Sequence, residues 1–173
     1  MGDHMEDHMG EKMGTLNTGD STLEVVHPSS WAPTKGYSAG MVSTARPHEA
    51  RHLFVAGQIG WSAEQVFETD DFIEQFTFAL DNVLSVVEAA GGRPEHIAEM
   101  TVYVTDLNAY RTRARELGPV WRERLGRHYP AMALVCVAGL VEERAQVEIQ
   151  ARAVLPPLSL PPSSPTPSQE PST

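Results

Sequence analysis

The chain has 173 residues, of which 41% are hydrophobic, and this length accommodates one ordinary domain and excludes two full ones. Its 23 acidic and 13 basic residues give a net charge of −10. An acidic chain with few lysines is a poor platform for phosphates, so we expect no binding to nucleic acid.

The apolar stretches are too short for a membrane span. The longest of them, such as residues 131–140, are about half of the roughly 20 residues that cross a bilayer. The N-terminus also lacks a basic region followed by an apolar run. We therefore expect a cytoplasmic protein with no membrane partner.

Both ends of the chain differ in composition from its middle. Residues 1–21 are rich in Met, Gly, Asp, His and Glu, and residues 156–173 are mostly Pro, Ser and Thr. Neither composition buries enough surface to offset the entropy of ordering. The sequence predicts a disordered leader over 1–21, one domain over 22–155 and a disordered tail over 156–173. No paired-histidine motif for zinc lies in the domain, so we expect no metal site.

The first half of the domain predicts three strands and a helix. The strands cover residues 23–27, 41–44 and 52–59, and the third is the strongest. A helix follows over residues 71–90, with Asp70 or Asp71 as its cap and a pair of glycines at its end. Its apolar residues recur at helical spacing: Phe72, Phe76, Leu80, Val83 and Val87.

The second half predicts a strand over residues 97–104, a helix capped by Asp106 or Asn108, and two final strands over 132–138 and 145–154. Gly118 and Pro119 interrupt this second helix. Because proline removes a backbone hydrogen bond, we expect a kink there or a restart with Pro119 in a first turn.

This order of elements predicts one six-stranded sheet with two helices on a single face. In the last strand, Val147, Ile149 and Ala151 alternate with polar residues and are expected to face the helices. We expect Met132, Leu134 and Cys136 on the opposite, uncovered face, with the thiol buried. So much apolar surface predicts that subunits close against each other.

Several segments together resemble the RidA/YjgF superfamily, in their order and spacing across nearly all of residues 22–155. They are Ala56-Gly57-Gln58-Ile59, the helix with Gln75 and Asn82 that ends in Glu88-Ala89-Ala90-Gly91, the run 101–107 (TVYVTDL), Pro130-Ala131, and Val147-Glu148-Ile149.

The resemblance implies an α+β domain of the chorismate-mutase type, with a mixed six-stranded sheet, assembled as a homotrimer with small-molecule clefts between subunits. Deaminases of this family hydrolyse 2-enamines and 2-imines, such as 2-aminoacrylate, to 2-keto acids and ammonia without a cofactor. An anionic substrate of this kind needs a cation for its carboxylate, preferably arginine, and water attack needs a positioned acid or base.

Transferred by position, most of the family's polar site residues are replaced. The clamp arginine falls on Met132 and the water-positioning glutamate on Gln150. Three further polar positions fall on Ala56, Ala114 and Leu134. The residues retained are Tyr37, Gly57, Gln58 and Pro130. These replacements argue against ordinary 2-imino acid deamination.

The replaced positions predict a mostly apolar pocket. Trp61 is a candidate aromatic wall, and backbone groups near Ala131 are candidates for binding polar atoms. Arg152 is a relocated cation or the ion-pair partner of Glu148 or of a neighbouring subunit. His128 is a titrating group near neutral pH or an ordinary helix-end residue.

Three functions remain open from the sequence. The first is an enzyme in which Tyr37 orients an enamine or imine and Gln150 or His128 handles water. The second is a noncatalytic ligand-binding or regulatory trimer, favoured by the loss of the clamp and the acid. The third, RNA cleavage, follows from endoribonuclease names in the family and is opposed by the acidic composition.

Overall fold

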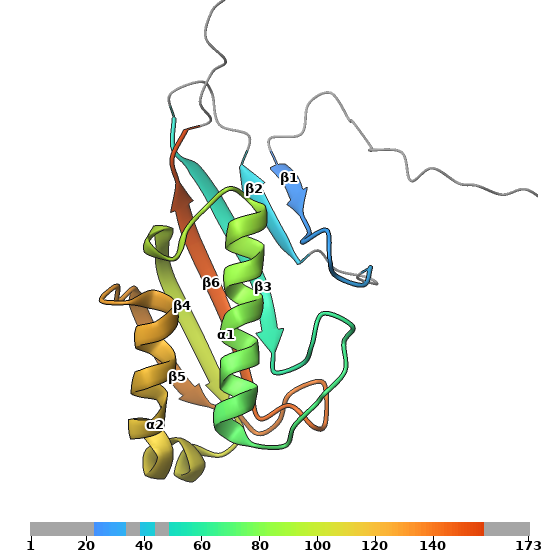
Figure 1. Cartoon of the computed structure of the whole chain (residues 1–173), viewed down its shortest axis with the longest axis vertical. Coiled ribbons are helices and arrows are strands. Elements are labelled where there is room, and N and C mark those ends of the chain that lie inside the picture. Colours follow the sequence, from blue (N-terminus) through green and yellow to red (C-terminus); the bar gives the residue numbers. More distant parts are fainter. Residues whose placement is uncertain (1–22, 34–38, 44–48, 158–173) are drawn as a thin grey trace, which may run out of the picture.

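The computed structural model describes residues 23–33, 39–43 and 49–157, and this part of the chain forms a mixed six-stranded sheet in the order β1-β2-β3-β6-β4-β5. Both long helices cover the same face of it (Figure 1). The predicted α+β class and order of elements are confirmed. The elements are β1 (Leu23–Val26), β2 (Gly40–Ser43), β3 (Arg51–Ile59), α1 (Phe72–Ala89), the short 3₁₀ helix η1 (Pro94–His96), β4 (Ile97–Val104), α2 (Leu107–Leu125), β5 (Ala131–Cys136) and β6 (Val147–Leu155).

The predicted leader and nearly all of the predicted tail lie outside the described residues. Among the described helices, none combines the length and the apolar composition that a membrane span requires.

The start of α1 follows the predicted capping. Asp71 Oδ1 accepts hydrogen bonds from the backbone N–H groups of Ile73, at 2.9 Å, and of Glu74, at 3.1 Å. These bonds satisfy two of the donors that a helix start leaves free. At the other end Gly91 adopts a positive φ of 75°, which glycine tolerates best. The apolar stripe of α1 then lies buried against the sheet.

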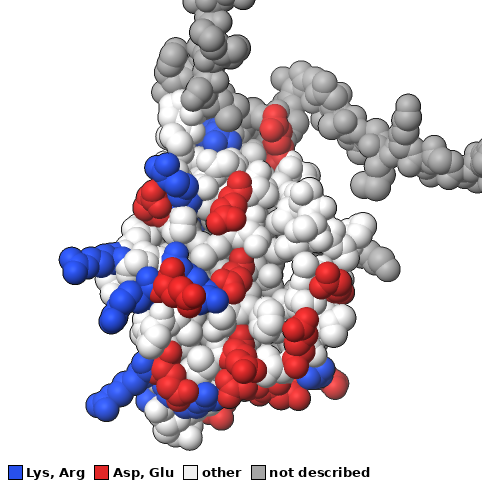
Figure 2. Space-filling view, viewed as in Figure 1, with Lys and Arg blue, Asp and Glu red and all other residues white. Residues whose placement is uncertain are grey.

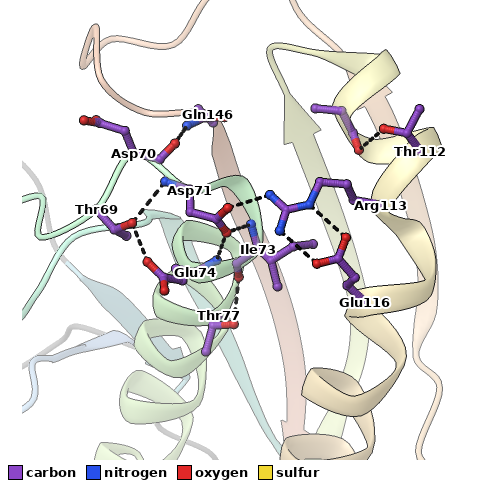
Figure 3. A network of polar contacts seen from close by, with 11 residues as sticks. Thr69, Asp70, Asp71, Ile73, Glu74, Thr77, Thr112, Arg113, Glu116 and Gln146 are labelled. Atoms are coloured by element: carbon purple, nitrogen blue, oxygen red, sulfur yellow. Dashed lines mark hydrogen bonds and ion pairs between the residues drawn. The ribbon is translucent and has the colours of Figure 1, made fainter.

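A polar network joins the start of α1 to α2 and to the loop before β6 (Figure 3). Arg113 of α2 donates to Asp71 Oδ2 at 2.6 Å and also pairs with Glu116. Gln75 is fully buried and bonds the carbonyl of Thr69, the carbonyl of Arg144 and, through its own oxygen, the N–H of Gln146. Asp70 and Asp71 therefore serve the framework of the fold.

Helix α2 continues through Pro119 without the predicted restart. The residue before a proline normally avoids helical geometry, because its Cβ and N–H clash with the proline ring. Gly118 has no Cβ and is exposed, which removes part of this conflict. The glycine that was taken to interrupt the helix thus permits it to continue.

The predicted face of Met132, Leu134 and Cys136 is wrong. Strand β5 pairs with β4 in parallel, so that Met132 lies beside Met100 and Leu134 beside Val102, and these β4 residues face the helices. The error came from extending the alternation of β6 to a strand that is not its neighbour in the sheet. Strand β5 is also an edge of the sheet, which leaves the thiol of Cys136 exposed in the chain, not buried.

The face of the sheet opposite the helices carries exposed apolar side chains, as the predicted order of elements implied. They lie on β1, β3, β5 and β6, and β3 and β6 are adjacent in the sheet. They are Val25, Phe54, Val135 and Val154, each more than 40% exposed. We call this surface the open face.

Candidate functional site

A pocket of about 210 Å³ opens between α2 and β5, and we call it the α2–β5 pocket. It brings together three of the predicted site residues: Ala114 from the helix, and Met132 and Leu134 from the strand. Val102 of β4 contributes to its apolar lining. Residues from separate elements meet here because parallel pairing aims the β5 side chains at α2.

The wall of this pocket is aromatic. Trp121 and Tyr129 stack with ring centroids 6.0 Å apart and planes 9° from parallel. Trp121 Nε1 donates to the carbonyl of His128 at 3.1 Å, which fixes the indole. Trp121 lies four residues from both Leu117 and Leu125, a spacing typical of an inward helix residue, and this spacing alone does not indicate that the face borders a cavity.

Trp61 does not line the α2–β5 pocket. It borders a much smaller depression beside Trp31, Gln58 and Asn82. Asn82 Nδ2 donates to the backbone carbonyls of Ile59, at 3.1 Å, and Trp61, at 2.9 Å, which holds this loop against α1. Trp61 therefore belongs to the framework around β3.

Arg122 supplies the one cationic side chain among the residues lining the α2–β5 pocket. In the described part of the chain, Arg122 forms no ion pair, whereas Arg113 and Arg124 of the same helix pair with Asp71 and Asp81. Its guanidinium thus keeps its donors for a ligand or for water.

A carboxyl group lies against Gly57, where the pairing of β3 with β6 shifts register. A Cβ atom added to Gly57 would lie 1.8 Å from Glu148 Oε1, so a larger residue here would displace this carboxylate from its position. Burial raises the pKa of Glu148 above its ordinary value. A carboxyl group with a raised pKa suits proton transfer near neutral pH.

Sequence reasoning named Glu148 in a family segment and as a possible ion-pair partner of Arg152, but it did not identify Glu148 as a site residue. The signal that identifies it is Gly57, because a glycine inside a strand often marks the close approach of another group. Gln58 is buried beside it, and its amide donates to the carbonyl of Ala56 at 3.0 Å.

Gln150 and Arg152 lie on the open face, in a shallow depression with Glu99 and Thr101. Arg152 Nη1 is 3.3 Å from Glu99 Oε2, and its guanidinium lies 5.9 Å from the ring centroid of Phe54. Within the chain, Arg152 therefore pairs with Glu99 and not with Glu148, the intrachain partner that was considered.

His128 is held by the backbone. Its Nε2 lies 2.7 Å from the carbonyl oxygen of Ile97, which can only accept, so this nitrogen is the donor. Pro130 and Ala131 precede Met132 at the start of β5. Tyr37 lies outside the described residues, as does any contact it makes.

The predicted site residues thus divide between the two faces of the sheet. Ala114, Met132 and Leu134 lie on the side of the helices, whereas Gln150 and Arg152 lie on the open face. Glu148 shares the open side, since it alternates with the buried Val147 and Ile149. Among the described residues, no three His, Cys, Asp or Glu side chains gather as metal ligands.

Comparisons with known proteins agree with this arrangement of elements. A family model described as Endoribonuclease L-PSP matches residues 28–155. The 2-iminobutanoate/2-iminopropanoate deaminase of Escherichia coli strain K12 is 33% identical over 102 residues, 59% of this chain and 78% of that protein. The RutC family protein PM1466 of Pasteurella multocida is 32% identical over 102 residues, again 59% and 78% of the two chains.

The crystal structure of Escherichia coli TdcF with bound serine superposes with a TM-score of 0.62 at 28% identity, covering 76% of this chain and 98% of that one. The family model spans about three quarters of the chain and includes every β-strand except β1. The chain therefore belongs to the Endoribonuclease L-PSP family, the RidA/YjgF superfamily that its sequence resembles.

Proposed function

We propose that this protein is a cytoplasmic homotrimeric hydrolase that converts a 2-imino or 2-enamino acid to the 2-keto acid and ammonia in clefts between subunits. The observation that carries the proposal is the carboxyl group of Glu148, which lies on Gly57 with its pKa raised by burial. A group of this kind supplies the acid and base function that Gln150 lacks.

The division of the site between two faces supports clefts formed by two subunits. Within one chain, the sheet separates Glu148 from Met132, so the two do not reach one small ligand. Strand β5 is an edge of the sheet, and apolar side chains on it are exposed, with Met132 at 50%. An exposed edge with apolar side chains is a ready template for contact with another chain. A neighbour that brings its open face to this edge would unite the two half-sites.

The chemistry needs one carboxylate. Ionised Glu148 accepts a proton from water while the water oxygen bonds to the carbon of the protonated imine, and the C=N π electrons pass to nitrogen, which gives a neutral carbinolamine. The protonated carboxyl then donates this proton to nitrogen. As the C–N bond breaks, the hydroxyl oxygen forms the carbonyl and its proton leaves with ammonia as ammonium. General acid and base catalysis of this kind contributes roughly 10²–10⁴-fold in rate.

The names of the relatives agree with this reaction. One relative is called a deaminase of 2-iminobutanoate and 2-iminopropanoate, and TdcF was crystallised with serine. RNA cleavage, which the family description mentions, finds little support in the charges. Acidic and basic side chains are interspersed over the face that carries the helices (Figure 2), and no continuous basic track is seen there.

The test measures ammonia and 2-keto acid released from 2-aminoacrylate and 2-iminobutanoate generated in situ. The wild-type protein is expected to accelerate release, and Glu148→Gln to lose at least about 100-fold of that acceleration. Glu142→Gln, at an exposed position in the loop before β6, is the matched control and keeps full activity.

An unaccelerated reaction at stoichiometric wild-type protein overturns the proposal. That result would favour the noncatalytic trimer, which the apolar Ala114, Met132 and Leu134 also suit. A monomeric mass by light scattering would overturn the cleft between subunits on its own.

A further inference from the structure

We propose that the ligand of this cleft is a 2-imino or 2-keto acid with an aromatic side chain, and that Arg122 binds its carboxylate. The inference rests on the proposed function for the place of the cleft, and it names the class of compound that the α2–β5 pocket selects. Three properties of the pocket carry it: its size, its aromatic wall and its single unpaired cation.

The size of the pocket exceeds what a methyl or hydroxymethyl side chain fills. An apolar cavity of about 150 Å³ is enough to hold benzene. The α2–β5 pocket has about 210 Å³, and Val102, Leu117 and Leu134 contribute to its apolar lining. A small polar side chain would leave this surface wet, whereas a phenyl or indole ring would cover it.

The wall favours a flat ring. Trp121 is fixed by its bond to the carbonyl of His128, and it stacks on Tyr129, which is 74% exposed. The two parallel rings offer an aromatic edge and face, and the hydrogen bond of Trp121 keeps the indole in place. Aromatic pairs add to the free energy of simple area burial. A ligand ring in the pocket gains this additional free energy of binding, whereas an aliphatic side chain does not.

The cation lies on the helix side of the pocket. Ala114, Gly118 and Arg122 follow one another at four-residue spacing and all line the pocket, and nothing lies within 4 Å of a Cβ built on Gly118. The two small residues leave open the path along α2 to the guanidinium. Arginine binds carboxylates through two parallel hydrogen bonds, which makes Arg122 a replacement for the clamp missing at Met132.

Binding of the 2-keto acid products tests the ligand class without requiring turnover. Phenylpyruvate, pyruvate and the neutral analogue phenylacetone are titrated into the full-length protein by calorimetry. We expect phenylpyruvate to bind at least about 30-fold more tightly than pyruvate. Equal affinities for the two acids overturn the proposal.

The role of Arg122 is tested with Arg122→Gln, against Arg115→Gln as the control. Arg115 is an exposed arginine of the same helix that does not line the pocket. Arg122→Gln is expected to weaken phenylpyruvate about tenfold and to leave phenylacetone unchanged, because only the acid uses the guanidinium. Equal effects of the two substitutions on phenylpyruvate overturn the assignment.

Ala114→Phe places a ring inside the pocket and is expected to abolish phenylpyruvate binding while the oligomeric mass stays that of the wild type. A changed mass with retained binding would show that a neighbouring chain occupies the pocket, and it would overturn the ligand class. Hydrolysis of 2-iminobutanoate without any preference for phenylpyruvate would overturn this inference alone. Tight phenylpyruvate binding without hydrolysis would overturn the proposed reaction alone.

Discussion

The region around Asp71, where the start of α1 contacts α2, differs sharply from the region where α2 faces β5. Around Asp71, the polar groups find partners within the chain: Gln75 uses both ends of its amide, and Arg113 pairs with two carboxylates. Around Met132, apolar side chains are exposed and Arg122 has no described partner. The first region satisfies its polar groups within one chain, whereas the second leaves apolar side chains exposed and its arginine without a described ion pair.

The largest expected effect on stability comes from Gln75→Ala, which tests whether the region around Asp71 depends on its internal polar contacts. The substitution leaves the carbonyls of Thr69 and Arg144 and the N–H of Gln146 without their partner at a buried position. Since a buried unsatisfied group costs about 1–3 kcal/mol, we expect a loss of about 3 kcal/mol in the free energy of unfolding. Urea unfolding measures this loss. Met132→Ala, on the edge strand β5, is the comparison, with an expected loss below about 1 kcal/mol. Similar losses for the two variants would contradict the distinction between the regions.

A smaller effect, on the rate of hydrolysis, is expected when a cation is placed in the α2–β5 pocket. Met132→Arg returns a guanidinium to the position where the family's clamp falls, and the side chain at 132 is half exposed and has room for it. We expect kcat/KM for 2-iminobutanoate to rise about tenfold, equivalent to about 1.4 kcal/mol of transition-state binding. Kinetics with in situ substrate measure it. An unchanged rate would show that the carboxylate is bound elsewhere.

The fold could be predicted from the sequence because its signals are local. The spacing from Phe72 to Val87 specifies α1, and the alternation from Val147 to Ala151 specifies the buried side of β6. The face of Met132 was predicted wrongly because it depends on pairing with β4, which is far away in the sequence.

The site was harder to predict than the fold. Position-by-position transfer found Ala114, Met132 and Leu134, which do line one pocket. It gave no indication of Trp121 or Arg122. The spacing of Trp121 is that of an ordinary inward helix residue, and Arg122 fits an ordinary solvated helix face. The role proposed for them depends on a cavity that exists only after β5 packs beneath α2.

The smallest expected effect links the stability of the fold to its chemistry, through Glu148→Gln. Burial raises the pKa of Glu148 in the folded protein above its unfolded value, so at pH 8 the ionised form is penalised only in the folded state. Near pH 4 the group is largely protonated in both states and the penalty nearly vanishes. The variant should therefore unfold at a slightly higher temperature than the wild type at pH 8 and at nearly the same temperature at pH 4. The gain is a fraction of the roughly 1.4 kcal/mol that one pKa unit represents.

Calorimetry at the two pH values measures this gain, with Glu142→Gln as the control. A variant that is more stable yet inactive would show that the lost activity comes from the missing proton acceptor and not from unfolding, whereas a destabilised variant at pH 8 would mean that the carboxylate has a partner which stabilises its charge.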